Sequence, residues 1–174
     1  QELQFVAGDE VIPIVKKYLL SPRLSDPATR VLARVNSARA NNALMSALSS
    51  VKGAPQLTLI KVLGDLQYTA AASKLLQIWP KATETTLKKI LLRSLANIGD
   101  ASANTVLESA AQKANFKFDP ADATGSYLVF LQRQLEKGNK SFVEKSSRNL
   151  LTNDNAPEQI KSAALSLLSE SAAN

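Results

Sequence analysis

The stretch from Leu87 to Ala114 constrains the fold of this chain more than any other part of it. Its first half places apolar residues at the three- and four-residue spacing of one helix face. Gly99 stands where that helix must end, because glycine takes the left-handed conformation that closes a helix C-terminus at no steric cost. Asp100 follows at the N-cap of a second helix, where a carboxylate accepts hydrogen bonds from free backbone N–H groups. The stretch therefore predicts a helix, a corner and a second helix.

The same pattern recurs along the chain. Gly64-Asp65 lies 35 residues before Gly99-Asp100, and each pair follows the end of an apolar stripe. Gly8-Asp9 has the same corner chemistry, while Gly138-Asn139 and Ser169-Glu170 are altered forms of it. Two-helix units that repeat every thirty to forty residues are typical of α-solenoids. We therefore predict an all-α solenoid of about four to five helix pairs that forms one domain over residues 1–174, with corners at Gly8, Asp9, Gly64, Asp65, Gly99 and Asp100.

Two motifs carry a family resemblance. VLGDL (62–66) and LANIGDASANTVL (95–107) resemble HEAT repeats, which are armadillo-like helical repeats, including the phycobilisome-lyase-like variety of HEAT. The resemblance is clear over residues 54–114 and extends as a pattern over most of residues 1–172. It implies a right-handed α-α superhelix that works as a protein-binding scaffold.

The remaining helices are predicted from apolar periodicity and from start signals such as Asp-Pro. After the tail of a helix at 1–8, we expect helices at 10–20, 26–35, 38–50, 55–63 and 69–79, the two-helix unit at 82–114, and helices at 119–137, 140–152 and 157–172. Within 119–137, Gly125 indicates either a kink or a later start of the helix. The predicted N-caps are Asp9, Asp26, Asp65, Asp100 and Asp119. The chain begins with the second helix of a pair and ends with the first of another. Because solenoids need polar terminal caps, we expect a segment of a larger protein.

Composition narrows the chemistry. The 174 residues contain no Cys and no His, which leaves no thiol, no imidazole base and no ordinary zinc site. Helix capping already accounts for most of the aspartates. We therefore predict that the protein is not an enzyme and has no catalytic, cofactor-binding or metal-binding residues. No window approaches the about 18 apolar residues of a membrane span.

The net charge of +6 is concentrated in residues 16–93, which contain 13 Lys and Arg against 3 Asp and Glu. Phosphate neutralisation dominates nucleic-acid affinity, so this half is a candidate nucleic-acid surface. No aromatic residues alternate with the cations to stack on bases, and solvated helix faces are the simpler interpretation. The residues proposed to line one basic face are Arg30, Arg34, Lys61, Lys74, Lys81, Lys88, Lys89 and Arg93.

The leading hypothesis is a non-catalytic scaffold for a protein partner or for adjoining domains of the same chain. A second resemblance suggests an alternative, since LQFVAGDEVIPIVKKYLL (3–20) and LIKVLGDL (59–66) are similar to the repeat region that accompanies 3-keto-disaccharide hydrolase-like domains. It implies an accessory role in an exported carbohydrate-processing protein, at the periplasm or cell surface. An enzyme resembling bilin lyases or HEAT-like base-excision enzymes would have to rely on a carboxylate and Trp79, and ranks last.

Overall fold

The computed structural model describes residues 8–172, and this part of the chain is all-α, as predicted, with no strand. It contains ten packed α-helices: α2 (Ile12–Val15), α3 (Ser25–Val35), α4 (Ala38–Ala47), α5 (Ala54–Asp65), α6 (Ala72–Ile78), α7 (Thr85–Ile98), α8 (Asn104–Lys113), α9 (Ala123–Glu136), α10 (Lys140–Leu151) and α11 (Glu158–Ala172). Five short 3-10 helices extend or connect them: η1 (Asp9–Val11), η2 (Lys16–Leu20), η3 (Thr69–Ala71), η4 (Trp79–Lys81) and η5 (Ala101–Ala103).

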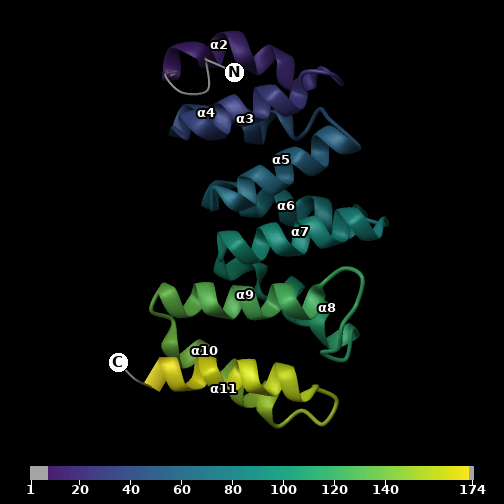
Figure 1. The fold of residues 1–174 in the computed structure, drawn as a ribbon, viewed down its shortest axis with the longest axis vertical. Coiled ribbons are helices and arrows are strands. Elements are labelled where there is room, and N and C mark those ends of the chain that lie inside the picture. Colours follow the sequence, from purple (N-terminus) through teal and green to yellow (C-terminus); the bar gives the residue numbers. More distant parts are fainter. Residues whose placement is uncertain (1–7, 173–174) are drawn as a thin grey trace.

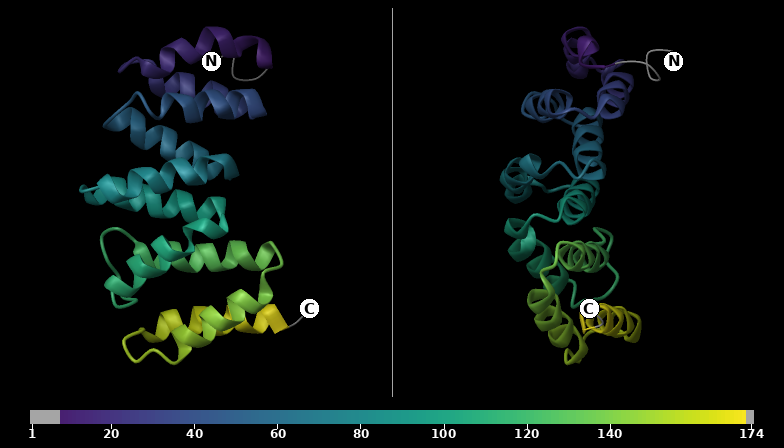
Figure 2. Two further views of the ribbon diagram at one scale, coloured as in Figure 1. Left: turned by 180° about the vertical axis from the view of Figure 1, so that it is seen from behind. Right: turned by 90° about the vertical axis from the view of Figure 1, so that its left-hand side faces the viewer.

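The helices follow one another along the long axis of the molecule, from α2 at one end to α11 at the other (Figure 1). Seen from the side, α5, α7, α9 and α11 lie in a first file, and α6, α8 and α10 lie beside them in a second (Figure 2, right). Within the first file α5 packs on α7, α7 on α9, and α9 on α11, while α8 packs on α9 and α10 on α11. Buried apolar side chains from all these helices form the core between the two files.

Helix α7 buries the apolar stripe that its sequence predicts. Leu91, Leu92 and Leu95 are fully buried, whereas Lys89 and Arg93 on the opposite face are exposed. Full burial of a leucine side chain is worth about 1.5–3 kcal/mol, so this stripe is what holds α7 between α5 and α9.

The corner after α7 is also confirmed. Gly99 takes a left-handed φ of 61°, and its N–H donates to the carbonyl of Leu95 at 3.0 Å. Asp100 is the N-cap of η5 and accepts a hydrogen bond from the backbone N–H of Ser102 at 3.0 Å. The Ser102 hydroxyl donates to the same carboxylate at 2.5 Å. These two hydrogen bonds hold the pKa of Asp100 below its usual value, because they stabilise the ionised form.

The next unit is attached to this corner. From α9, the Gln134 side chain donates to the carbonyl of Gly99 at 2.9 Å. The Lys137 ammonium donates to the carbonyls of Ile98 and Gly99 at 3.0 and 2.6 Å. The unpaired carbonyls at the end of α7 are therefore satisfied by the following helix of the same file.

The corner predicted at Gly64-Asp65 is wrong. Helix α5 continues through both residues, and the chain turns only afterwards, at Gln67, which has a φ of 50°. Gly64 is glycine for a different reason: a Cβ atom there would lie 2.6 Å from the Cα atom of Ser94 on α7. Asp65 caps nothing and pairs with Lys61 of its own helix at 2.5 Å. The motif marks a close helix–helix contact, which the sequence cannot distinguish from a helix end.

The first predicted corner is wrong as well. Gly8 has an extended backbone with a φ of −97°, and Asp9 begins η1 instead of capping a helix with its side chain. The Asp9 carboxylate accepts a hydrogen bond from the Ser37 hydroxyl and lies 3.5 Å from the Arg39 guanidinium, so it connects η1 to the start of α4. The helix tail predicted at 1–8 lies, apart from Gly8, outside the described residues.

Of the two other predicted caps, Asp26 has a different role, whereas Asp119 binds a free N–H group at the start of α9 from a position outside the helix. Asp26 lies inside the first turn of α3, whose N-cap is Leu24, and pairs with Arg30 at 2.8 Å. Asp119 lies four residues before α9, where its carboxylate accepts hydrogen bonds from the N–H groups of Ala121 and Ala123 at 2.8 and 2.7 Å. Helix α9 therefore begins at Ala123 and not at 119. The helices predicted at 10–20 and 69–79 are each divided into short α-helical and 3-10 parts.

Replacing Asp100 and Asp65 with alanine distinguishes a capping aspartate from a non-capping one. We expect Asp100→Ala to lower the free energy of unfolding by about 0.5–2 kcal/mol, because it removes an N-cap. Asp65→Ala is expected to change it by less than about 0.5 kcal/mol, since an exposed ion pair contributes little. Because the folded-state pKa of Asp100 is lowered, its contribution is complete at neutral pH and is lost as the pH falls below the ordinary value of the carboxyl group. Urea denaturation followed by circular dichroism measures both variants, and equal losses would contradict the corrected assignment.

Candidate functional site

The eight residues of the predicted basic face come from five elements. Arg30 and Arg34 lie on α3, Lys61 on α5, and Lys88, Lys89 and Arg93 on α7. Lys74 lies on α6, in the second file, and Lys81 follows that helix in η4. Lys74 and Lys88 are half-buried, whereas the other six are exposed. The helices that carry these residues come from both files, and a single basic face stays a prediction.

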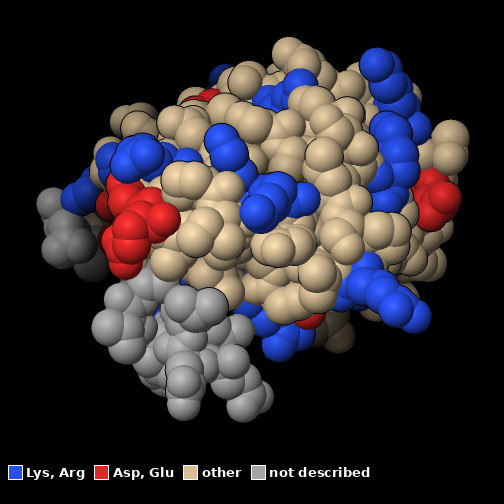
Figure 3. All heavy atoms as spheres, turned by 90° about the horizontal axis from the view of Figure 1, so that it is seen from above, with Lys and Arg blue, Asp and Glu red and all other residues tan. Residues whose placement is uncertain are grey.

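Some of these cations are engaged in ion pairs. Arg30 pairs with Asp26 and Lys61 pairs with Asp65. Among residues 8–172, Arg34, Lys89 and Arg93 form no ion pair within 4.0 Å. Viewed from the N-terminal end, Lys and Arg appear as scattered groups separated by uncharged side chains (Figure 3). This face of the molecule shows no continuous basic track.

The N-terminal end has a groove of about 650 Å³ between η2 and α4. We call this the N-terminal groove. Its apolar lining includes Leu20 and Ala43, and its charged lining consists of Lys16, Lys17 and Arg39. No acidic residue is part of the lining, and Arg39 is already near Asp9. The groove therefore joins apolar surface to positive charge.

Exposed apolar side chains gather at the same end. Six large apolar residues are exposed within the described part of the chain, and four of them fall between residues 14 and 24: Ile14 (59% exposed), Tyr18 (40%), Leu20 (54%) and Leu24 (45%). Leu20 lines the groove, and the other three come from the same short stretch of chain, a concentration of exposed apolar surface that is typical of interaction sites. Lys17 lies over the Tyr18 ring at 5.6 Å from its centroid, which adds a cation to this cluster.

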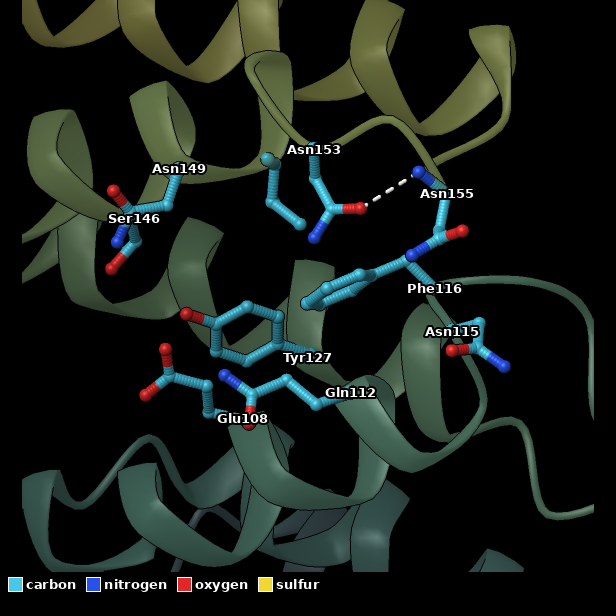
Figure 4. Close-up of a pocket in the computed structure, with 10 residues that line it drawn as sticks. Glu108, Gln112, Asn115, Phe116, Tyr127, Ser146, Asn149, Asn153 and Asn155 are labelled. Atoms are coloured by element: carbon cyan, nitrogen blue, oxygen red, sulfur yellow. Dashed lines mark hydrogen bonds between the residues drawn. The ribbon is translucent and has the colours of Figure 1, made fainter.

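A second, polar cavity of about 230 Å³ lies between α8, α9 and α10 (Figure 4). We call it the amide pocket, because half of its lining residues carry carboxamide groups. The floor is buried and consists of Phe116, Tyr127, Ser146 and Leu150. The walls and rim consist of Glu108, Gln112, Asn115, Asn149, Asn153 and Asn155. No Lys or Arg lines it.

Local backbone geometry shapes this pocket. After α8, Asn115 and Phe116 both adopt the left-handed conformation, with φ of 52° and 54°. This conformation is uncommon for an aromatic residue and costs about 1–2 kcal/mol. It is stabilised by a hydrogen bond from the N–H of Phe116 to the carbonyl of Ala111 at 2.9 Å, and it leaves the Phe116 ring in the cavity (Figure 4). On the other wall, the Asn153 side chain accepts a hydrogen bond from the N–H of Asn155 at 2.9 Å.

Burial raises the pKa of Tyr127 to about 12, an effect that hydrogen bonding with Ser146 opposes and that the charge of Glu108 supports. The phenol therefore stays neutral over the physiological range. A neutral hydroxyl both donates and accepts hydrogen bonds, so Tyr127 and Ser146 provide two adaptable hydroxyl groups at the floor of the pocket.

The raised pKa of Tyr127 makes stability fall at alkaline pH. The unfolded chain ionises this tyrosine near pH 10 and the folded chain only near pH 12, so folding loses stability as the pH rises between these values. The expected loss from this group is about 1.4 kcal/mol at about pH 11, one pKa unit above its ordinary value. Tyr127→Phe removes the titration. Between about pH 9 and pH 11, the free energy of unfolding of the variant is therefore expected to fall by about 1.4 kcal/mol less than that of the wild type. Urea denaturation at both pH values measures the difference, and equal losses would show that Tyr127 is not buried as described.

Other predicted features have plain structural roles. Trp79 is half-buried and packs against the core. Within residues 8–172, no three Cys, His, Asp or Glu residues lie close enough to hold a metal ion. No helix in the same range is both long enough and apolar enough to cross a membrane.

Comparison with known proteins does not identify a family for this chain. No family model, no curated protein and no solved structure matches this chain. The resemblance to HEAT repeats and the one to the repeat regions beside 3-keto-disaccharide hydrolase-like domains thus stay predictions. The described residues form an all-helical protein of ten packed helices.

Proposed function

We propose that this chain is a non-catalytic helical-repeat scaffold, of the HEAT-like right-handed type with about four to five helix pairs, and that it binds a protein segment at the N-terminal groove. The two-file stacking of antiparallel helix pairs supports the repeat architecture. A separate protein and an adjoining domain of the same polypeptide present the same chemistry to this groove. The observation that carries the proposal is the cluster of exposed apolar side chains beside unpaired positive charge.

The groove selects the chemistry of its partner. Leu20 is 54% exposed and lies in the groove, where an apolar side chain of the partner would cover it. Lys16 and Lys17 line the same groove and form no ion pair in the described part of the chain. A complementary segment is therefore apolar on one face and acidic at its edges, as in an amphipathic helix bound in a groove.

A designed peptide tests this proposal directly. The probe is a fluorescent amphipathic helix with leucines on one face and glutamates flanking them, and the comparison is the same helix with lysines in place of the glutamates. We expect the acidic helix to bind, with an affinity that falls as salt is added, and the basic helix to bind at least tenfold more weakly. Equal binding of both helices, or binding of neither, would overturn the proposal.

Two matched variants locate the binding surface. Leu20→Glu places a charge in the N-terminal groove and is expected to weaken binding of the acidic helix at least tenfold. Leu165→Glu makes the same change on α11, where the leucine is 57% exposed, and is expected to leave binding unchanged. If both variants weaken binding equally, the peptide does not bind in the groove.

Nucleic-acid binding is the second candidate, and one observation favours it. Arg34 on α3 and Lys89 and Arg93 on α7 are exposed cations without a carboxylate partner within residues 8–172. Contact with three phosphates predicts a slope of about −2.7 in a plot of log affinity against log salt. The test measures binding of a short DNA duplex by the wild type and by a triple alanine variant of these cations. The control variant replaces Lys113, Lys117 and Lys145 instead, which are exposed lysines outside the predicted basic face. Absence of binding at low salt, or equal losses in both variants, would eliminate this candidate.

A further inference from the structure

We propose that the amide pocket binds a neutral polyhydroxylated ligand, namely one ring of a saccharide. The pocket lies between α8, α9 and α10, away from the N-terminal groove between η2 and α4. It is thus a separate site, and its test does not depend on whether the groove binds a protein.

The hydrogen-bonding groups of the pocket define its ligand class. Each carboxamide presents two donors and an acceptor, and the Tyr127 and Ser146 hydroxyls can each do both. A hydroxyl group of the ligand can donate to one such group and accept from another. A ligand that only donates, such as an ammonium ion, can pair with the carboxamide oxygens but not with their N–H groups, so it uses only part of the hydrogen-bonding capacity of the pocket.

Charge excludes the anionic ligands. Phosphate and carboxylate ligands are bound mainly through Arg and Lys, and neither type lines this pocket. The only ionisable acid in the lining is Glu108, which is half-buried in the wall. A carboxylate is a strong acceptor, so Glu108 suits a hydroxyl donor of an uncharged ligand.

The floor suits a ring with one apolar face. Phe116 is 7% exposed and Leu150 is 2% exposed, and both present carbon atoms to the cavity. A sugar ring carries C–H groups on its faces and hydroxyls around its edge, so its face matches these side chains while its edge reaches the carboxamides of the rim. In Figure 4 the rings of Phe116 and Tyr127 lie between Gln112 on one side of the cavity and the carboxamides of Asn149, Asn153 and Asn155 on the other.

Size and rigidity limit the ligand to about one ring. A volume of about 230 Å³ is below the about 300–1,000 Å³ of pockets for drug-sized molecules. The pocket is also built before a ligand arrives, because helices α9 and α10 carry Tyr127 and Ser146, and the left-handed turn at Phe116 fixes the aromatic ring. Strain of this kind is concentrated at binding sites, where it holds side chains in position.

The test is an NMR titration of the isotope-labelled protein with glucose, galactose, mannose and N-acetylglucosamine, each at millimolar concentration. We expect at least one sugar to shift the side-chain amide signals of Asn149 and Gln112 in a saturable manner. Two further probes represent other ligand classes: N-acetylarginine amide for a cationic side chain and blocked trialanine for a peptide backbone. The proposal is overturned if no sugar shifts these signals, or if either of the other probes shifts them as strongly as the best sugar.

Three variants and one control confirm the location. Gln112→Ala and Asn149→Ala each remove an exposed rim carboxamide, and Tyr127→Phe removes only the floor hydroxyl. Each is expected to weaken sugar affinity about three- to tenfold, as expected for the loss of one hydrogen bond. Gln77→Ala makes the same change on the exposed surface of α6 and is expected to leave affinity unchanged. Because both rim residues are exposed, their replacement does not disturb the core, and unchanged affinity in both rim variants would place the sugar elsewhere.

Discussion

Phe130→Ala is expected to lower the free energy of unfolding by about 3–5 kcal/mol. Phe130 lies on α9, has no exposed surface and is among the largest fully buried side chains. Its ring meets that of Phe142 on α10 edge-on, with centroids 6.2 Å apart and planes at 80°. Truncation removes this aromatic contact and leaves a cavity where the two files meet. Urea denaturation followed by far-UV circular dichroism measures the loss.

Phe118→Ala is the matched control for this prediction. Phe118 lies in the connection between α8 and α9 and is 93% exposed, so the same truncation there should change the free energy of unfolding by less than about 0.5 kcal/mol. The contrast separates burial from residue type, since the two variants lose the same atoms. A loss below about 1 kcal/mol for Phe130→Ala would contradict the packing of α9 on α10.

The second prediction concerns the close approach of α5 to α7. Gly64→Ala places a Cβ atom 2.6 Å from both the Cα and the Cβ of Ser94, a separation that real Cβ atoms do not adopt. Because one of the obstructing atoms belongs to the backbone, the helices must move apart. We expect a loss of about 2–3 kcal/mol, in the upper part of the range for overpacked sites. This loss is larger than the gain of about 1 kcal/mol in helix propensity that alanine has over glycine in a helix interior, so the variant is expected to be less stable than the wild type. Urea denaturation measures the net change.

Gly125→Ala provides the control for a helical glycine that is not wedged against backbone. Gly125 lies in the first turn of α9, and a Cβ there would meet the carboxylate end of the Asp122 side chain, which can rotate away. The expected result lies between no change and a gain of about 1 kcal/mol. If Gly64→Ala is tolerated equally well, the contact between α5 and α7 is looser than described.

The fold class and most helix positions follow from the sequence, because apolar periodicity depends on local spacing. The periodicity predicts α7, α10 and α11 to within three residues at each end. The corner at Gly99-Asp100 is predicted correctly because both its signals are local: positive φ and a free N–H group. The identical dipeptide at Gly64-Asp65 is misread, because the reason for that glycine is Ser94, on another helix. Sequence spacing alone contains no information about which helices touch.

For the same reason the sequence does not reveal the amide pocket. Its residues come from α8, from the turn after α8, from α9, from α10 and from the loop before α11. In the sequence, Glu108 and Gln112 are ordinary polar residues on a helix, and Asn153-Asp154-Asn155 is an ordinary loop. The one usable signal is the frequency of asparagine between 115 and 155, which has no periodic spacing. The basic face rests on charge counts alone, and its residues come from helices of both files, because a count of charges does not specify where the side chains point.

The stacking of the helices in files also determines how far a destabilising substitution affects the rest of the molecule. Helix α5 packs on α7 and α7 on α9, and the end of α7 is bound by Gln134 of α9 and by Lys137, the residue after that helix. Each helix is therefore coupled mainly to its neighbours, so the free-energy changes caused by Gly64→Ala on α5 and Phe130→Ala on α9 are expected to add. Substitutions around the N-terminal groove, between η2 and α4, are therefore expected to leave the amide pocket between α8, α9 and α10 unchanged.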